Sequence, residues 1–254
     1  MPDVEMSVSR GIATVTLNRP PVHALTTALY ERLAEMFEDL GRSFDAHCAI
    51  LTATGRRAFS AGKDLHEFLA TTVEDDPIKA AVARRTFSAI LDCAVPVIAA
   101  VNGPALGAGA VLAAMCDIRL ASEDATFGLP EINVGRCGGG APLGRLLPQG
   151  VVRRMFFTGQ PISAAEAYRL GFVQSVTAAD DLMEEARRLA AVIASKAPLG
   201  IRYGKAALNE VEGLPVKEGY AIEQRYSTKL MATEDAREAT RAVLEKRPPI
   251  FNGR

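Results

Sequence analysis

Histidine and cysteine are scarce in this chain, and tryptophan is absent. The 254 residues contain 3 His, 4 Cys and no Trp. The cysteines are widely separated and form no CxxC pair, which argues against a disulfide scaffold and a zinc site. Because HExxH, GxSxG and GxxxxGK[ST] motifs are also missing, a metal hydrolase, a serine–histidine hydrolase and a P-loop enzyme are disfavoured. We expect no metal, and we expect the three histidines, His23, His47 and His66, at the surface or in turns.

The sequence also lacks an excess of either charge and any long apolar run. The formal net charge is −1, with no strongly basic block, so nucleic acid is not an expected partner. The apolar runs are shorter than the roughly 20 residues that cross a bilayer. The N-terminus has neither the basic stretch nor the apolar core of a signal peptide. We therefore expect a soluble cytoplasmic protein without a membrane partner.

The N-terminal half alternates short apolar strands with helices. Apolar and polar residues alternate over 4–9 and 12–17, which predicts an opening hairpin. Apolar residues at helical spacing over 29–40 predict a helix that Thr26 or Thr27 can cap. The apolar runs 49–53 and 97–101 predict buried strands. This alternation indicates an α/β fold in which helices cover a sheet.

Helical patterns dominate from about residue 150. Ser163 and Glu166 form a capping box, and Gly171 ends that short helix. Further helices are predicted over 178–195, 199–211, 216–230 and 235–245. No long linker separates this part from the first, so we expect the two to pack as one unit.

Two turns of small residues are candidate anion sites. The first is AFSAGKD at 58–64, where Asp64 can begin a helix, and the second is NGPALGAG at 102–109, which follows a predicted strand and leads into a helix. Glycine lets a ligand approach the main chain, and free N–H groups at a helix start carry positive partial charge. One N–H from each turn could form an oxyanion hole. Two merely tight turns are the alternative.

Glu131 is the candidate proton carrier. It lies in FGLPEIN at 127–133, between apolar neighbours and just before a Gly-rich stretch. An apolar environment raises the pKa of a carboxyl group, which suits it to taking and returning a proton. The alternative is an ordinary solvated loop glutamate.

In this order, the three stretches resemble the enoyl-CoA hydratase/isomerase family, or crotonase superfamily. The resemblance extends from LNRP at 17–20 through CDIRLA at 116–121 to EKRPP at 245–249. It implies an α/β fold, with a spiral of ββα units over 1–195 and a helical region over 196–254. In this family the helical region is used to assemble a homotrimer or a dimer of trimers.

The resemblance also implies roles for individual residues. The N–H groups of Lys63 and Ala108 would hold the thioester carbonyl of an acyl-CoA substrate, and Glu131 would move the proton. The main chain of Ala24 and Ala61 would contact the CoA adenine, and His66 would lie near its phosphates. No separate cofactor is implied, because the substrate itself carries coenzyme A.

One departure bears on the reaction. Hydratases that this chain resembles place a second glutamate in the helix after the second turn, where this chain has Val111. A single carboxylate can still shift a double bond, so enoyl-CoA isomerisation is favoured. Hydration through a substituted water site, thioester hydrolysis, carbon–carbon cleavage and non-catalytic acyl-CoA binding stay open. Lys63 replaces a more usual small residue and can favour a polar acyl group.

Overall fold

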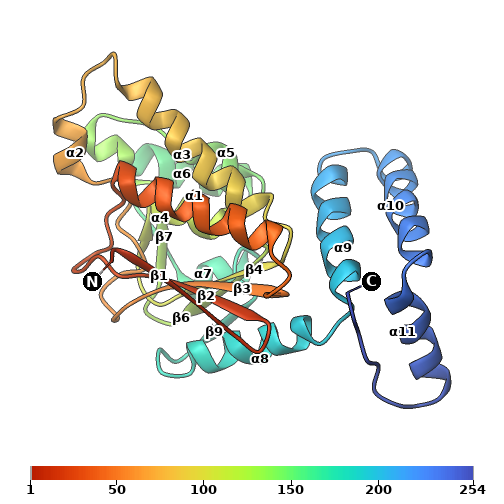
Figure 1. The fold of residues 1–254 in the computed structure, drawn as a ribbon. Coiled ribbons are helices and arrows are strands. Elements are labelled where there is room, and N and C mark those ends of the chain that lie inside the picture. Colours follow the sequence, from red (N-terminus) through yellow and green to blue (C-terminus); the bar gives the residue numbers. More distant parts are fainter. Residues whose placement is uncertain (1, 254) are drawn as a thin grey trace.

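The computed structural model describes residues 2–253 and opens with the predicted hairpin (Figure 1). Strand β1 (Val4–Ser9) pairs antiparallel with β2 (Ile12–Leu17). In β2 every second side chain is buried, whereas β1 buries only Val4. β1 therefore forms the outer edge of the sheet, and β2 begins its core.

The main sheet has six strands in the order β1-β2-β3-β4-β6-β9, and every pair after the hairpin is parallel. β3 (Cys48–Ala53) and β4 (Val97–Val101) are buried throughout, as their continuous apolar sequences predict. β6 (Ile118–Ser122) and β9 (Ser175–Thr177) complete the sheet.

A second, three-stranded sheet has the order β5-β7-β8. It consists of β5 (Ala105–Leu106), β7 (Thr126–Gly128) and β8 (Ile162–Ser163). Because these strands are only two or three residues long, the alternation that marks a strand in a sequence is absent from them.

Helices cover both faces of the main sheet. On one face, α1 (Thr27–Arg42) packs against α3 (Asp76–Leu91), and Thr26 caps α1 by accepting from the Leu29 N–H. On the other face, α8 (Leu182–Ala194) packs its buried residues onto β3 and β4. The shorter helical segments are α2 (Leu65–Leu69), α4 (Ala108–Met115), η1 (Pro130–Val134), α5 (Gly140–Gly144), α6 (Gln149–Thr158) and α7 (Ala164–Arg169).

Three C-terminal helices stand to one side of this core (Figure 1). They are α9 (Pro198–Val211), α10 (Val216–Met231) and α11 (Glu234–Leu244). α9 is tied to the core by Lys205, whose Nζ lies 2.7 Å from Asp117, and by Arg202, which donates to the Gly41 carbonyl at 2.8 Å. The predicted boundary at residues 195 and 196 falls between α8 and α9.

The predicted helices are confirmed to within two residues, with one exception. The helix predicted over 178–195 begins only at Leu182, because residues 175–177 are drawn into the sheet as β9 and a turn follows them. None of the helices described between residues 2 and 253 is long and apolar enough to cross a membrane.

Candidate active site

The first predicted turn is held against the loop that precedes α1. Leu25 donates its N–H to the Gly62 carbonyl at 2.8 Å and accepts from the Asp64 N–H at 3.0 Å. Asp64 then caps α2 by accepting from two N–H groups of its first turn. Lys63 lies between these bonds, and its own N–H finds no acceptor among residues 2–253. This amide is therefore free to bind a ligand.

The second turn presents a similar amide. Gly107 has φ of 55°, a conformation that favours glycine, and donates its N–H to the Gly128 carbonyl at 2.8 Å. The chain then enters α4, whose first residue is Ala108. As expected at a helix start, the Ala108 N–H has no acceptor within the described part of the chain. The helix dipole adds positive potential there.

The two turns touch each other. A Cβ atom on Gly62 would lie only 3.1 Å from the amide nitrogen of Ala108 and 2.7 Å from the Leu106 carbonyl oxygen. Gly109 packs as closely on the Ser60 main chain. Glycine is required at these positions because the two backbones approach without room for a side chain. The approach brings the free amides of both turns to one region.

Glu131 lies beside the second turn, on η1. Its Oε1 lies 2.6 Å from where a Cβ on Gly107 would stand, and its buried Oε2 has no hydrogen-bond partner within residues 2–253. Burial raises the pKa of the Glu131 carboxyl group above its ordinary value. The alternative of a fully solvated loop glutamate is therefore wrong.

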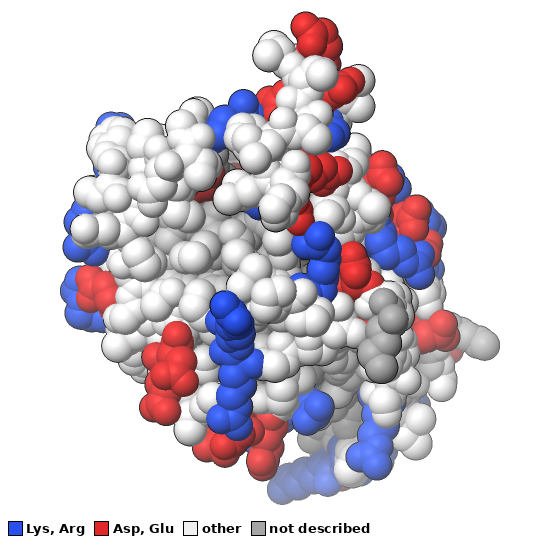
Figure 2. All heavy atoms as spheres, turned by 90° about the vertical axis from the view of Figure 1, so that its left-hand side faces the viewer, with Lys and Arg blue, Asp and Glu red and all other residues white. Residues whose placement is uncertain are grey.

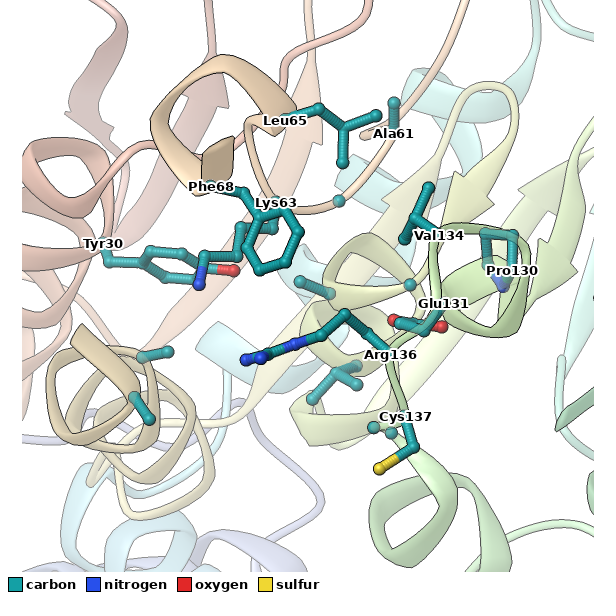
Figure 3. A pocket seen from close by; sticks show the side chains of 18 of the residues that line it. Tyr30, Ala61, Lys63, Leu65, Phe68, Pro130, Glu131, Val134, Arg136 and Cys137 are labelled. Atoms are coloured by element: carbon teal, nitrogen blue, oxygen red, sulfur yellow. The ribbon is translucent and has the colours of Figure 1, made fainter. Parts of the chain in front are cut away.

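These groups line one cavity of about 480 Å³ (Figure 3). Lys63, Ala108, Val111 and Glu131 all contribute to its wall, as does Ala61. Most of the remaining wall is apolar. In Figure 2, the face of the molecule that carries α2 is largely uncharged, with Lys, Arg, Asp and Glu gathered mainly around its margin. Such a hollow suits a largely apolar ligand with a few polar anchors.

Two of the predicted coenzyme contacts lie outside the cavity wall. Ala24 is half-buried, and its carbonyl accepts from Arg19 Nη1 at 3.1 Å. His66 is exposed on α2, where its main-chain N–H donates to Asp64. Both residues flank the first turn, whereas only Ala61 of the three reaches the cavity.

His23 lies in a turn, which is one of the two places expected for it, but it is buried rather than at the surface. Its side chain is 2% exposed. Nδ1 accepts from the Arg19 N–H at 3.1 Å, and Nε2 donates to the Thr54 carbonyl at 3.0 Å. Burial lowers the pKa of this imidazole, and the bond to Thr54 opposes that effect. The ring is buried because it satisfies two main-chain groups that link neighbouring loops.

Val111 contributes hydrocarbon to the cavity wall that Glu131 also lines. Its side chain is 4% exposed, and its Cγ2 lies 3.2 Å from where a Cβ on Gly139 would stand. Gly139 has φ of 74°, so the Gly-rich loop can fold down onto Val111 only with glycine there. The cavity consequently offers one carboxylate near the free amides rather than two.

A family model described as enoyl-CoA hydratase/isomerase matches residues 7–254, nearly the whole chain. The chain belongs to the enoyl-CoA hydratase/isomerase (crotonase) superfamily. The predicted resemblance is thereby confirmed, and with it the α/β crotonase fold of mixed sheets and C-terminal helices.

Relatives of this crotonase carry out more than one reaction. It is 40% identical to (7aS)-7a-methyl-1,5-dioxo-2,3,5,6,7,7a-hexahydro-1H-indene-carboxyl-CoA hydrolase from Rhodococcus jostii, over 87% of this chain and 85% of that protein. The Mycobacterium tuberculosis protein of the same name is 39% identical, over 97% and 100%. The crystal structure of an enoyl-CoA hydratase from Bacillus anthracis superposes with a TM-score of 0.95 at 31% identity, covering both chains fully. Membership of the family therefore indicates an enzyme that acts on acyl-CoA substrates, but it does not determine which reaction this protein catalyses.

Sequence reasoning missed several residues that line the crotonase cavity. They come from α1, α2, α3 and the Gly-rich loop, and the main ones are Tyr30, Phe68, Asp76, Arg84 and Arg136. None lies in a motif, and they are far apart in the sequence. A helical face that points toward the cavity looks the same in sequence as one that points to solvent or core, so no local signal marks them.

Proposed function

We propose that this crotonase shifts the double bond of an enoyl-CoA, with the oxyanion held by the Lys63 and Ala108 amides. Glu131 takes a proton from C2 of a 3-enoyl-CoA, and the electron pair moves toward the thioester oxygen. The same carboxyl group returns its proton to C4, which gives the 2-enoyl-CoA. No atom is gained or lost, and Glu131 ends in its starting state.

The observation that carries this proposal is one carboxylate, with its Oε2 unpaired, in the same cavity as two unpaired amides. Oxyanion donors stabilise charge that develops in the transition state, and each contributes about 3 kcal/mol. A buried acid with a raised pKa exchanges protons with carbon more readily than a solvated one. Val111 supplies no second carboxylate to orient water, which favours isomerisation over hydration.

Hydrolysis of a CoA thioester is the second candidate. It is supported by the two relatives at 40% and 39% identity that are named CoA hydrolases. The same amides can stabilise the oxyanion formed when water attacks, with Glu131 as the base for that water. Lys63, Ala108 and Glu131 keep their places in both reactions.

Product analysis separates these reactions. The protein is incubated with a 3-enoyl-CoA and, separately, with a 2-enoyl-CoA, and the products are resolved by liquid chromatography and mass spectrometry. Isomerisation gives a new peak of unchanged mass, hydration adds the mass of water, and hydrolysis releases free CoA. Proton transfer by Glu131 is excluded if Glu131→Gln turns over as fast as the wild type.

We also propose that the main chain of Ala24 and Ala61 contacts the CoA adenine and that His66 lies near its phosphates. Ala61 lies in the turn that supplies the Lys63 amide, and Ala24 and His66 flank that turn. Titration of the protein with CoA and with dephospho-CoA tests the phosphate contact. His66→Ala should narrow the difference in affinity between these two ligands.

A homotrimer, or a dimer of trimers, is proposed for the assembly. The C-terminal helices and the turns beside them expose several large apolar side chains, which a soluble protein rarely leaves uncovered. They include Leu208, Val216, Tyr220, Met231, Val243 and Leu244. Native mass spectrometry measures the assembly directly, and a monomer at micromolar concentration would contradict the proposal.

A further inference from the structure

Charged side chains gather at one part of the cavity. Arg136 places Nη2 2.8 Å from both carboxylate oxygens of Asp76, and Lys63 places Nζ 3.6 Å from the same carboxylate. Arg84, from α3, also lines the cavity and is exposed. Two cations therefore contact one carboxylate, and a third lines the same cavity, whose wall is otherwise largely apolar.

An aromatic ring fixes two of these cations. Lys63 Nζ lies 5.3 Å from the centroid of the Phe68 ring, and Arg136 Cζ lies 4.9 Å from it. Cation–π contacts at such distances are favourable. Because Lys63 and Arg136 share both Phe68 and Asp76, their charged ends are held near each other.

The positive charge here is not balanced within the protein. Arg136 lowers the pKa of the Asp76 carboxyl group, which keeps one negative charge in place. Lys63 Nζ meets Asp76 only at 3.6 Å, which is long for a hydrogen bond, and among residues 2–253 Arg84 forms no ion pair. The lining carries three positive charges on Lys63, Arg84 and Arg136 and at most two negative charges on Asp76 and Glu131, so positive charge is left for a ligand.

A neutral donor faces the same space. Tyr30 is 5% exposed and lines the cavity, and within the described residues its hydroxyl has no hydrogen-bond partner. Burial first, and then the nearby Glu131 and Glu67, raise the pKa of this phenol, so it stays protonated. In Figure 3 its hydroxyl and the end of Lys63 lie on the side of the cavity opposite Glu131, and Arg136 points toward that side.

The cavity wall also offers apolar surface that can contact methylene groups. α3 contributes Ala80, Ala83 and Phe87 to it. In the proposed function the Lys63 main chain holds the thioester, and the four-carbon side chain of the same residue limits how far away its Nζ can lie. A ligand group that meets Lys63 Nζ is therefore expected at the length of a short acyl chain, roughly four to six carbons, from the thioester.

We propose that the acyl group of the substrate ends in a carboxylate, bound by Lys63 and Arg136 with Tyr30 as a hydrogen-bond donor. The substrate is then a CoA monothioester of a short dicarboxylic acid. Arg136 offers a planar fork that matches a carboxylate, and Lys63 offers a compact charge. This inference rests on the proposed function, because it requires the thioester to lie between Glu131 and the two amides.

Matched ligands test the proposal by isothermal titration calorimetry. Succinyl-, glutaryl- and adipoyl-CoA are compared with butyryl-, pentanoyl- and hexanoyl-CoA, which have the same chain lengths but end in methyl groups. Free CoA is titrated as well. In at least one pair the carboxylate ligand should bind about tenfold more tightly, as expected for charge-assisted hydrogen bonds from two partly exposed cations.

Variants locate the effect. Lys63→Met keeps the main-chain amide and most of the stem, so it should reduce the preference for the carboxylate ligand to about one. Lys79→Met is the matched control. Lys79 lies on α3, which supplies several residues of the cavity wall, but Lys79 itself does not line the cavity and donates to Thr71 Oγ1 at 2.9 Å. It should keep the wild-type preference.

The outcomes are distinguishable. If methyl-ended ligands bind as tightly as their carboxylate partners, the inference is overturned and the proposed function stands. If Lys63→Met weakens the binding of free CoA and of both ligand types by the same factor, the cations bind the coenzyme phosphates. The inference is again overturned. If neither ligand type binds, the proposed function fails together with it.

Discussion

Replacing Ala108 with proline removes the N–H group that we propose as one of the two oxyanion donors. Ala108 is the first residue of α4, a position that proline tolerates because its N–H has no helical acceptor. The preceding Gly107 has φ of 55° and ψ of −122°, outside the α region that a following proline disfavours. Because the Ala108 N–H bonds to no acceptor in the described chain, we expect the free energy of unfolding to change by no more than about 1 kcal/mol.

The catalytic effect should be much larger. Loss of one donor removes about 3 kcal/mol of transition-state stabilisation, so turnover of the enoyl-CoA should fall about 10²–10³-fold. The assay is steady-state kinetics on the substrate found by product analysis, with thermal unfolding measured on the same preparation. Affinity for free CoA, which has no thioester carbonyl, should stay within about threefold of the wild type.

A matched proline separates the lost donor from a general effect of proline at a helix start. Glu234 is the exposed first residue of α11, and it follows Thr233, whose backbone is extended. Glu234→Pro should leave turnover unchanged. The reasoning is refuted if Ala108→Pro folds and keeps its kcat/KM within about threefold of the wild type.

Three further predictions concern the acid and its surroundings. Glu131 must be ionised to take a proton, so kcat/KM should fall as pH drops through its raised pKa, with a midpoint above the ordinary value of 4.5, and this limb should vanish in Glu131→Gln. A buried acid with a raised pKa destabilises the folded state once the pH exceeds the ordinary pKa of that acid, because the charged form is then favoured in the unfolded chain. Glu131→Gln removes this charge and should therefore be more stable than the wild type by about 1 kcal/mol at neutral pH. That gain corresponds to about 2–4 °C in Tm, and a melting temperature that is unchanged or lower at neutral pH would contradict it. Val111→Glu restores the second carboxylate that hydratases of this family carry, so it should add water to a 2-enoyl-CoA, and a product of unchanged mass would contradict this.

The first four strands of the main sheet and most of the longer helices could be predicted from sequence because their patterns are local, whereas β6 and β9 were not predicted. Neighbouring residues are enough to predict these elements. Examples are the alternation in β2, the continuous apolar runs of β3 and β4, and the cap at Thr26. The short strands of the second sheet could not be predicted, since two or three residues carry no period. β9 was missed for the same reason, because its pairing with β6 is set by contacts between distant parts of the chain.

The candidate site was predicted in part. The two turns could be proposed because close approaches of the main chain require small residues, which are visible in the local sequence. Glu131 could be proposed because it is an acid among apolar sequence neighbours. The cations were harder to foresee, since Lys63 and Arg136 meet only through Asp76 and Phe68, which belong to other elements. The burial of His23 likewise depends on the distant carbonyl of Thr54.

Exchange of the α-hydrogens of a saturated acyl-CoA in heavy water measures proton transfer without any later step. The ligand is incubated with the wild type and with Glu131→Gln, and deuterium at C2 is followed by proton NMR. Enolate formation at the amides predicts deuterium uptake with the wild type and its loss in the variant. No uptake with the wild type, or equal uptake with both proteins, would contradict the role assigned to Glu131.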